Sequence, residues 1–225
     1  MTDSWQEVWQ LREELYSFFG NCLLKPIDES NKAALSRTFW DNFPLETANE
    51  QMKSGLELMV ECTSKLEVLS EEEAIQKVMI EYTALFLGPG RPQAPPWESV
   101  YRTPERLLFG WPAFDVRETM RLYGIEIRKK YQQPEDHIGL ELIFLSVVSE
   151  KLKESVLSQQ TPMIREQINF IDKHLLSWIP ELCRDAKLNG SVGYYGGLIE
   201  LIWGVLLWDY ELLEEFLTKR GVALG

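Results

Sequence analysis

The sequence predicts an all-α fold, a single-domain compact bundle of about eight to ten helices over residues 1–225. Apolar side chains recur at helical spacing along most of the chain. The alternating stretch Ile125-Glu126-Ile127 is too short for a strand and has no obvious pairing partner. Short loops join the helical segments, and neither a fixed-period repeat nor a low-complexity linker separates them, so we expect one domain.

Local signals place the helices of the N-terminal third. Residues 4–24 begin with a serine that is followed three residues later by a glutamate, the spacing of a capping box. A weaker segment lies within 27–44, and a third helix is expected over 46–65. A fourth begins behind Ser70, because three glutamates follow at the helix end where the dipole favours acids.

The rest of the chain continues the helical pattern. The segment 133–150 is apolar almost all round and should be central, and Gly124 is expected as a left-handed C-cap. Val192–Trp208 approaches the hydropathy of a membrane span, but it is short and carries Glu200, so we expect a buried core helix there. Helices are expected over 103–110, 112–123, 133–150, 161–178, 181–187 and 194–219.

The stretch 81–103 breaks this pattern. An apolar helix ends at Leu87, and Gly88-Pro89-Gly90 with three further prolines prevents its continuation. We expect an extended, polyproline-like segment held beside the helix that it leaves. Trp97 and Tyr101 follow directly, and such large side chains either enter the core or contact a partner.

Composition limits the possible partners. The chain has 225 residues, 45% apolar and 26% charged, with a formal net charge of −12. This charge argues against nucleic acid and against stable association with an anionic membrane, because both require clustered lysine and arginine. It suits a basic ligand, although an acidic surface also simply keeps a protein soluble.

Cysteine usage and the N-terminus indicate a cytoplasmic protein. Cys22, Cys62 and Cys183 lie far apart and form no CxxC pair, so we expect buried, reduced thiols rather than disulfides or a zinc site. The first residues lack both a basic start and a long apolar run, so no signal peptide is expected.

One cluster could carry chemistry. His137 follows Glu135 and Asp136 and lies one turn before Glu141. A metal- or nucleotide-dependent enzyme using His137 and these carboxylates is the alternative hypothesis. It is weakened because the chain has only two histidines and no phosphate-binding loop. A helix cap at Asp136 with a hydrogen-bonded His137 would explain the same pattern without metal or catalysis.

Three motifs occur in order along the chain. They are E-Y-x-x-L-F-x-G-P-G with P-P-W-E-S-V-Y at 81–90 and 95–101, P-E-D-H-I-x-x-E-L-x-F at 134–144, and F-x-x-x-H-L-x-x-W-x-P at 170–180. Together they resemble the TorD/DmsD family of cytoplasmic chaperones for redox enzymes. The resemblance implies an all-helical, non-enzymatic protein without a cofactor. Such a protein binds the twin-arginine signal peptide of a molybdenum-cofactor oxidoreductase precursor and assists its maturation before export.

The resemblance also implies which residues bind the peptide. The arginine pair would meet Asp136 and the neighbouring Glu135, while aromatic side chains take the apolar part. We expect Leu85 and Val100 to point inward. The implied peptide-binding residues are Tyr82, Leu85, Phe86, Pro96, Trp97, Tyr101, Gly110, Asp136 and His137, with Glu135 as an additional acidic contact.

Overall fold

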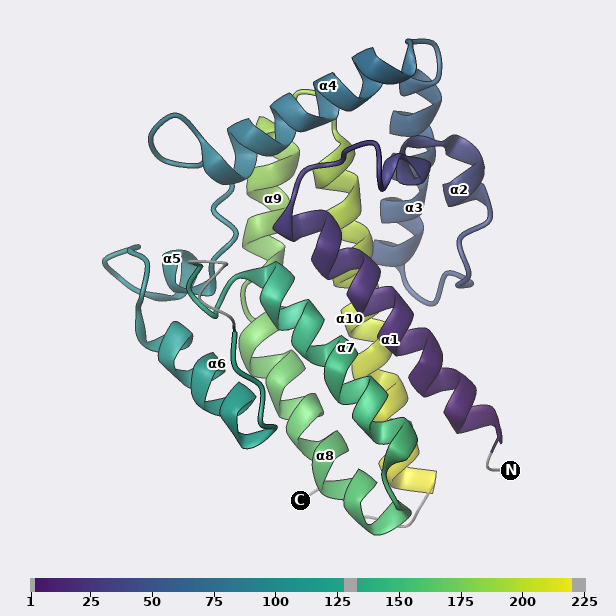
Figure 1. Cartoon of the computed structure of the whole chain (residues 1–225), viewed down its shortest axis with the longest axis vertical. Helices are drawn as coiled ribbons and strands as arrows, with labels where there is room; N and C mark the ends of the chain where they lie inside the picture. Colours follow the sequence, from purple (N-terminus) through teal and green to yellow (C-terminus); the bar gives the residue numbers. More distant parts are fainter. Residues whose placement is uncertain (1–2, 128–132, 220–225) are drawn as a thin grey trace. The chain divides into compact units, whose positions relative to one another are not determined.

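The described residues, 3–127 and 133–219 of the computed structural model, form helices and contain no β-strand (Figure 1). Their only bridge of strand type joins Trp97 and His137 as an isolated antiparallel pair. The all-α fold class is confirmed, and helices α1 to α10 agree with the expected eight to ten. Ser4 lies in α1, but its side chain is outside the described part.

The chain divides into two compact units, which are described separately. Unit 1 comprises Met1–Leu24, Trp97–Trp178 and Asp209–Gly225, and unit 2 comprises Lys25–Pro96 and Ile179–Trp208. The expectation of a single domain over residues 1–225 stays a prediction.

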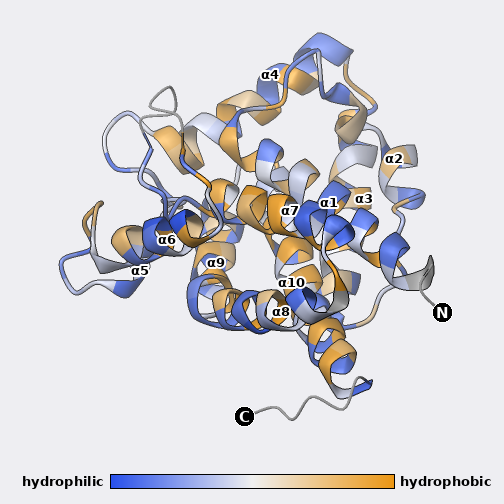
Figure 2. Cartoon of the chain, turned by 60° about the horizontal axis from the view of Figure 1, so that its bottom comes forward, coloured by the Kyte–Doolittle hydropathy of each residue, from blue (hydrophilic) through white to orange (hydrophobic). Residues whose placement is uncertain are grey.

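Unit 1 is built around a central apolar helix. It contains α1 (Asp3–Leu24), α5 (Glu98–Arg102), α6 (Trp111–Leu122), α7 (Ile138–Glu154), α8 (Leu157–Phe170) and the end of α10 (Tyr194–Lys219). Helix α7 runs beside α1 (Figure 1) and is mostly hydrophobic (Figure 2). The two backbones approach closely at Gly20 and Gly139, since a Cβ on Gly20 would lie 2.8 Å from the Gly139 carbonyl oxygen. The expected central position is therefore confirmed.

A buried ion pair joins α1 to the end of α10. Arg12 donates to both carboxylate oxygens of Asp209, at 2.6 and 3.0 Å, and neither residue is exposed to solvent. The remaining guanidinium donors reach Ser149 and Gln167, and the Tyr16 hydroxyl donates to Asp209 at 2.5 Å. Because every charged atom has a partner, the desolvation cost of the pair is offset.

Unit 2 packs helices against the first part of α10. It contains α2 (Arg37–Asp41), α3 (Glu50–Leu66), α4 (Glu71–Tyr82) and α9 (Ile179–Asn189). A Cβ on Gly55 of α3 would lie 2.4 Å from the Leu201 nitrogen, and one on Gly204 would lie 2.3 Å from the Met52 nitrogen. Gly55 of α3 and Gly204 of α10 therefore allow the two helices to pack closely. Among the described residues, no helix has an apolar stretch long enough to cross a membrane.

Capping signals set the starts of α3 and α4. The Asn49 side chain accepts a hydrogen bond from the Met52 backbone at 2.9 Å. Ser70 and Glu73 form the reciprocal pair of bonds of a capping box. At the other end of a helix, Gly124 has a φ of 67° just beyond α6 and is the expected left-handed C-cap.

Several expected helix boundaries are wrong, and the helix expected over 133–150 begins at Ile138 instead. The helix expected over 103–110 is replaced by a loop, and the helical turn α5 lies just before it. The Thr103 hydroxyl donates back to the Ser99 carbonyl, at the end of α5, instead of capping a following helix. Helix α8 starts at Leu157, with Pro162 inside it rather than at its first turn.

Each of two motif segments contains a π-helical turn. One covers Thr83–Leu87 at the end of α4, and the other covers Ile171–Leu176 after α8. Such turns insert one extra residue into a helix and are frequent at functional sites. Both motifs therefore depart locally from regular helix geometry.

Candidate functional site

The first part of the first motif, residues 81–90, contributes to the core of unit 2. Tyr82, Leu85 and Phe86 are at most 3% exposed, and the rings of Tyr82 and Phe86 pack edge-on against Tyr195. The proline-rich segment folds back onto this turn, because the Ala94 amide donates to the Leu85 carbonyl at 2.8 Å. The segment lies beside the helix that it leaves, as expected, but it bends at residues 89–91 and 93–94 instead of running extended. Leu85 points inward as predicted.

Glu81, the first residue of this motif, caps the start of α10. Its buried carboxylate accepts hydrogen bonds from the backbone amides of Val192, of Gly193 at 2.7 Å and of Tyr195 at 2.9 Å. A carboxylate at a helix N-terminus satisfies free amides and interacts favourably with the helix dipole. This role is not evident from the sequence, because the two segments lie 111 residues apart.

Trp97 and His137 lie side by side in unit 1. Besides their backbone bridge, their rings meet edge-on with centroids 5.6 Å apart. His137 is the N-cap of α7, and its Nδ1 accepts a hydrogen bond from the Gly139 amide at 3.0 Å. Burial lowers the pKa of His137 to about 3, so the imidazole is neutral near pH 7. The juxtaposition of these motifs, implied by the resemblance, is therefore present.

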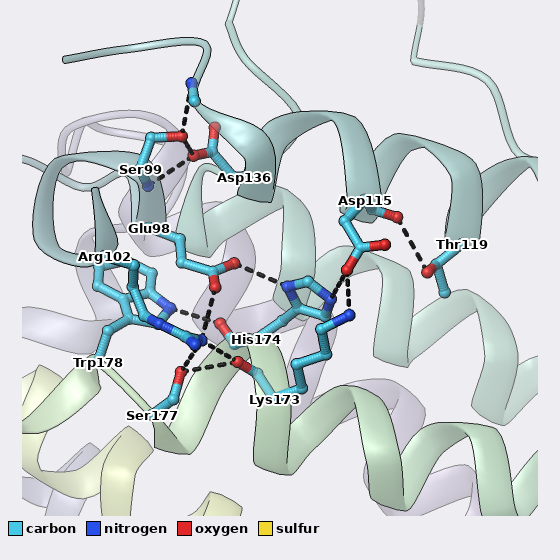
Figure 3. Close-up of polar contacts among 11 residues, drawn as sticks. Glu98, Ser99, Arg102, Asp115, Thr119, Asp136, Lys173, His174, Ser177 and Trp178 are labelled. Carbon is cyan, nitrogen blue, oxygen red and sulfur yellow. Dashed lines mark hydrogen bonds and ion pairs between the residues drawn. The ribbon is translucent and has the colours of Figure 1, made fainter. Parts of the chain in front are cut away.

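Asp136 holds the start of α5. Its Oδ2 accepts from the Ser99 amide at 2.8 Å and from the Ser99 hydroxyl (Figure 3). Its backbone carbonyl accepts from the Glu98 amide at 3.0 Å. Its Oδ1 has no hydrogen-bond partner among the described residues. Burial raises the pKa of Asp136 above its usual value. The expected cap at Asp136 thus acts on α5, whereas His137 caps α7.

Glu98 and His174 connect the first and third motifs. A Glu98 carboxylate oxygen lies 2.8 Å from His174 Nδ1 in a hydrogen bond, and Glu98 accepts from Arg102 at 3.0 Å (Figure 3). The other ring nitrogen of His174 lies 3.2 Å from Asp115, which also pairs with Lys173. This network fixes α5, α6 and the π-helical turn that follows α8 to one another.

The side chain of Glu141 faces this network. Glu141 is fully buried, and neither carboxylate oxygen has a hydrogen-bond partner among the described residues. Burial, with Glu98 and Asp136 nearby, raises its pKa well above the usual value. Glu98, Glu141 and His174 offer ligand atoms within 4.8 Å of one another, so these three could hold a metal ion. His137 is not part of this group.

Tyr101, Gly110 and Glu135 are the predicted binding residues that retain exposure. Gly110 is enclosed on one side, where a Cβ would lie 2.6 Å from the Thr103 side chain. Glu135 already binds a guanidinium group, that of Arg117, through two bonds of 2.7 and 2.8 Å. Pro96, Trp97, Asp136 and His137 are buried, and Trp97 is 9% exposed.

Five exposed apolar side chains close in sequence to Gly110 were not predicted as binding residues. They lie in the loop after α5 and the first turn of α6, a segment with many hydrophobic positions (Figure 2). We call them the 107–114 surface, comprising Leu107 (65% exposed), Leu108 (41%), Phe109 (57%), Trp111 (45%) and Phe114 (54%). The signal in the sequence was the apolar run Leu107-Leu108-Phe109 directly before Gly110, which had been assigned to a helix.

Comparison with known proteins identifies the family. The model of a family described as nitrate reductase delta subunit matches residues 45–184, more than half of the 225-residue chain. The chain belongs to this family. All three motifs lie within the matched region, and the resemblance to the TorD/DmsD chaperones is confirmed.

Several relatives of the family match nearly the whole chain. "Chaperone protein TorD" of Vibrio cholerae serotype O1 (strain ATCC 39541) is 27% identical over 210 residues, covering 92% of this chain and 94% of the relative. Proteins of the same name from Psychrobacter sp. (24% over 225 residues, covering 95% and 96%) and Aliivibrio salmonicida (26% over 207 residues, covering 90% and 94%) also match. Their names describe chaperones, which supports the non-enzymatic prediction.

Proposed function

We propose that this protein is a cytoplasmic chaperone that binds the twin-arginine signal peptide of a molybdenum-cofactor oxidoreductase precursor and assists its maturation before export. The observation that carries the proposal is family membership, together with relatives named chaperone protein TorD that match the chain over nearly its full length. The protein acts by binding and not by catalysis.

The charge of the chain supports a basic, partly apolar ligand. A twin-arginine signal peptide combines an arginine pair with an apolar segment, and a protein of net charge −12 attracts the arginines over a distance. The attraction decreases as salt screens it. The apolar segment requires exposed apolar side chains, and unit 1 provides them at the 107–114 surface.

The residues carried over from the family take two roles in this proposal. Tyr101, Gly110 and Glu135 are partly exposed. In this proposal they contact the peptide directly. The buried members position the surrounding backbone: Asp136 and His137 fix the starts of α5 and α7. Direct contact between the peptide and the buried Tyr82, Leu85, Phe86, Pro96, Trp97, Asp136 and His137 stays a prediction.

Peptide titration tests the proposal. Fluorescence anisotropy of a labelled twin-arginine signal peptide should show saturable binding that weakens when both arginines are changed to alanine. Binding should also weaken between 50 mM and 500 mM salt, because a charge contact is screened. Absence of binding, or equal binding of both peptides, would contradict the proposal.

The metal-dependent alternative has a separate test. Metal analysis of the purified protein should show less than stoichiometric metal. Stoichiometric metal that is lost in Glu141→Gln, but retained in the exposed control Glu61→Gln, would favour the alternative, with Glu98, Glu141 and His174 as the ligands.

A further inference from the structure

We infer that the 107–114 surface is the docking site for the apolar segment of the client signal peptide, a role not assigned to these residues by the family motifs. The inference rests on the proposed function and names the part of the peptide that this surface receives. Its five side chains, Leu107, Leu108, Phe109, Trp111 and Phe114, fall within eight consecutive positions and are 41–65% exposed. Clustered exposed apolar side chains of this size mark interaction sites.

The backbone holds these side chains in an exposed position. Arg106 and Phe109 have φ values of 52° and 62°, a left-handed conformation that is uncommon for residues other than glycine. Such strain persists only where surrounding contacts enforce it. Here the Gly110 amide bonds to the Ser99 hydroxyl at 3.1 Å, and Arg106 donates to the Val100 carbonyl at 3.3 Å.

The same anchoring links the surface to the second motif. Ser99 binds Gly110 on one side and Asp136 on the other, so the loop is fixed to the start of α7 through one hydroxyl group (Figure 3). A docking surface ordered before binding loses less conformational entropy when the ligand arrives. The buried Asp136 therefore supports peptide binding through the loop.

Charges around the rings determine which part of the peptide fits. The Arg102 guanidinium lies 5.1 Å and the Lys173 ammonium 5.9 Å from the centroid of the Trp111 ring. The Arg117 guanidinium lies 5.4 Å from the centroid of the Phe114 ring. These cations already occupy cation–π positions at both rings and are themselves paired with Glu98, Asp115 and Glu135, so an incoming arginine finds these positions taken. The surface is therefore suited to the uncharged apolar segment, and the arginine pair binds elsewhere on the acidic protein.

The test combines two protein variants with three peptides. The double variant Leu107→Ser/Phe114→Ser changes two exposed side chains, and Leu122→Ser/Val156→Ser changes two other exposed apolar side chains of unit 1, 79% and 61% exposed, as a control. The peptides are a labelled twin-arginine signal peptide, a version with both arginines changed to alanine, and a version with serine throughout the apolar segment. Circular dichroism verifies that both variants are folded.

The 107–114 variant should bind the unmodified peptide at least about tenfold more weakly than the wild type, while the control variant binds normally. Serine substitution in the peptide should weaken binding to the wild type but have little further effect on the variant. Equal affinity of variant and wild type for the unmodified peptide overturns the inference and leaves the proposed function intact. The inference is also overturned if serine substitution in the peptide weakens binding to the variant as much as it weakens binding to the wild type.

Two further outcomes are distinguishable. The wild type could bind the alanine peptide as tightly as the unmodified one, while the variant binds both weakly. This result would support the docking surface and contradict recognition of the arginine pair. If light scattering shows a wild-type dimer that the variant converts to a monomer without loss of peptide affinity, the surface is an interface between copies and the inference is overturned. Absence of binding to every peptide overturns both proposals.

Discussion

Asp136 accepts two hydrogen bonds from Ser99, one from its amide and one from its hydroxyl, across 37 residues of sequence. The contact joins two motifs and fixes the short helix α5 against the start of α7. An aspartate that sequence analysis assigned to peptide recognition is therefore also a structural residue.

Asp136→Ala should lower the free energy of unfolding by about 1–3 kcal/mol, because the Ser99 donors lose their buried acceptor. Asp136→Asn retains an acceptor oxygen and should cost less. Urea denaturation of both variants checks this. A fully stable Asp136→Ala variant with weakened peptide binding would instead indicate direct recognition by Asp136.

Replacing Arg12 by methionine should destabilise the protein by about 3–5 kcal/mol, since Asp209 would remain as a buried, unpaired charge. The double variant Arg12→Met/Asp209→Leu should recover much of this loss. The measurement is the urea midpoint of the wild type, both single variants and the double variant. Additive losses would argue against coupling between the two residues.

Glu141→Gln should stabilise the protein near pH 8. Since burial raises the pKa of Glu141 in the folded state, ionisation opposes folding as the pH rises above about 4.5, the usual value in an unfolded chain. The variant has no such group, so its advantage should shrink as the pH falls toward 4.5. Thermal unfolding between pH 4.5 and 8 tests the trend, with the exposed Glu61→Gln as control. A loss of stability at pH 8 would mean that the carboxylate has a favourable partner.

His137 should contribute to loss of stability in acid. Its folded-state pKa of about 3 lies below the unfolded value of 6.5, so the unfolded chain gains a proton as the pH falls between these values. His137→Asn preserves an N-cap and should reduce the decline in stability by up to about 1.4 kcal/mol per pH unit. Urea unfolding at pH 7, 6, 5 and 4 measures this slope. An unchanged slope would show that other groups cause the acid sensitivity.

Local signals predicted much of the fold. The capping box at Ser70 and the left-handed Gly124 depend on residues within one helical turn, and both were correct. The Thr103-Pro104 signal failed because the Thr103 hydroxyl ends α5 instead of starting a helix. Whether Thr103 ends α5 or starts another helix depends on how Ser99 and Gly110 pack. Their hydrogen bond cannot be read from the local sequence.

The candidate site was predictable in part. The resemblance indicated that Trp97 and His137 belong together, and their rings do meet. It could not separate side chains that contact a ligand from those that support the backbone, because both kinds are aromatic or acidic. The bonds of Glu81 to the start of α10 join segments far apart in sequence. Recognising them requires the fold.

The π-helical turn at Ile171–Leu176 affects how relatives should be aligned. One inserted residue rotates every later side chain by about 100° around the helix axis. His174 lies within the turn and Trp178 follows it, so the position of a gap decides whether an aligned histidine can reach Glu98. A relative with one residue fewer here would have the same motif letters but a different helical phase. Aligning the motif letters alone would then assign the Glu98–His174 contact to a relative whose histidine points elsewhere.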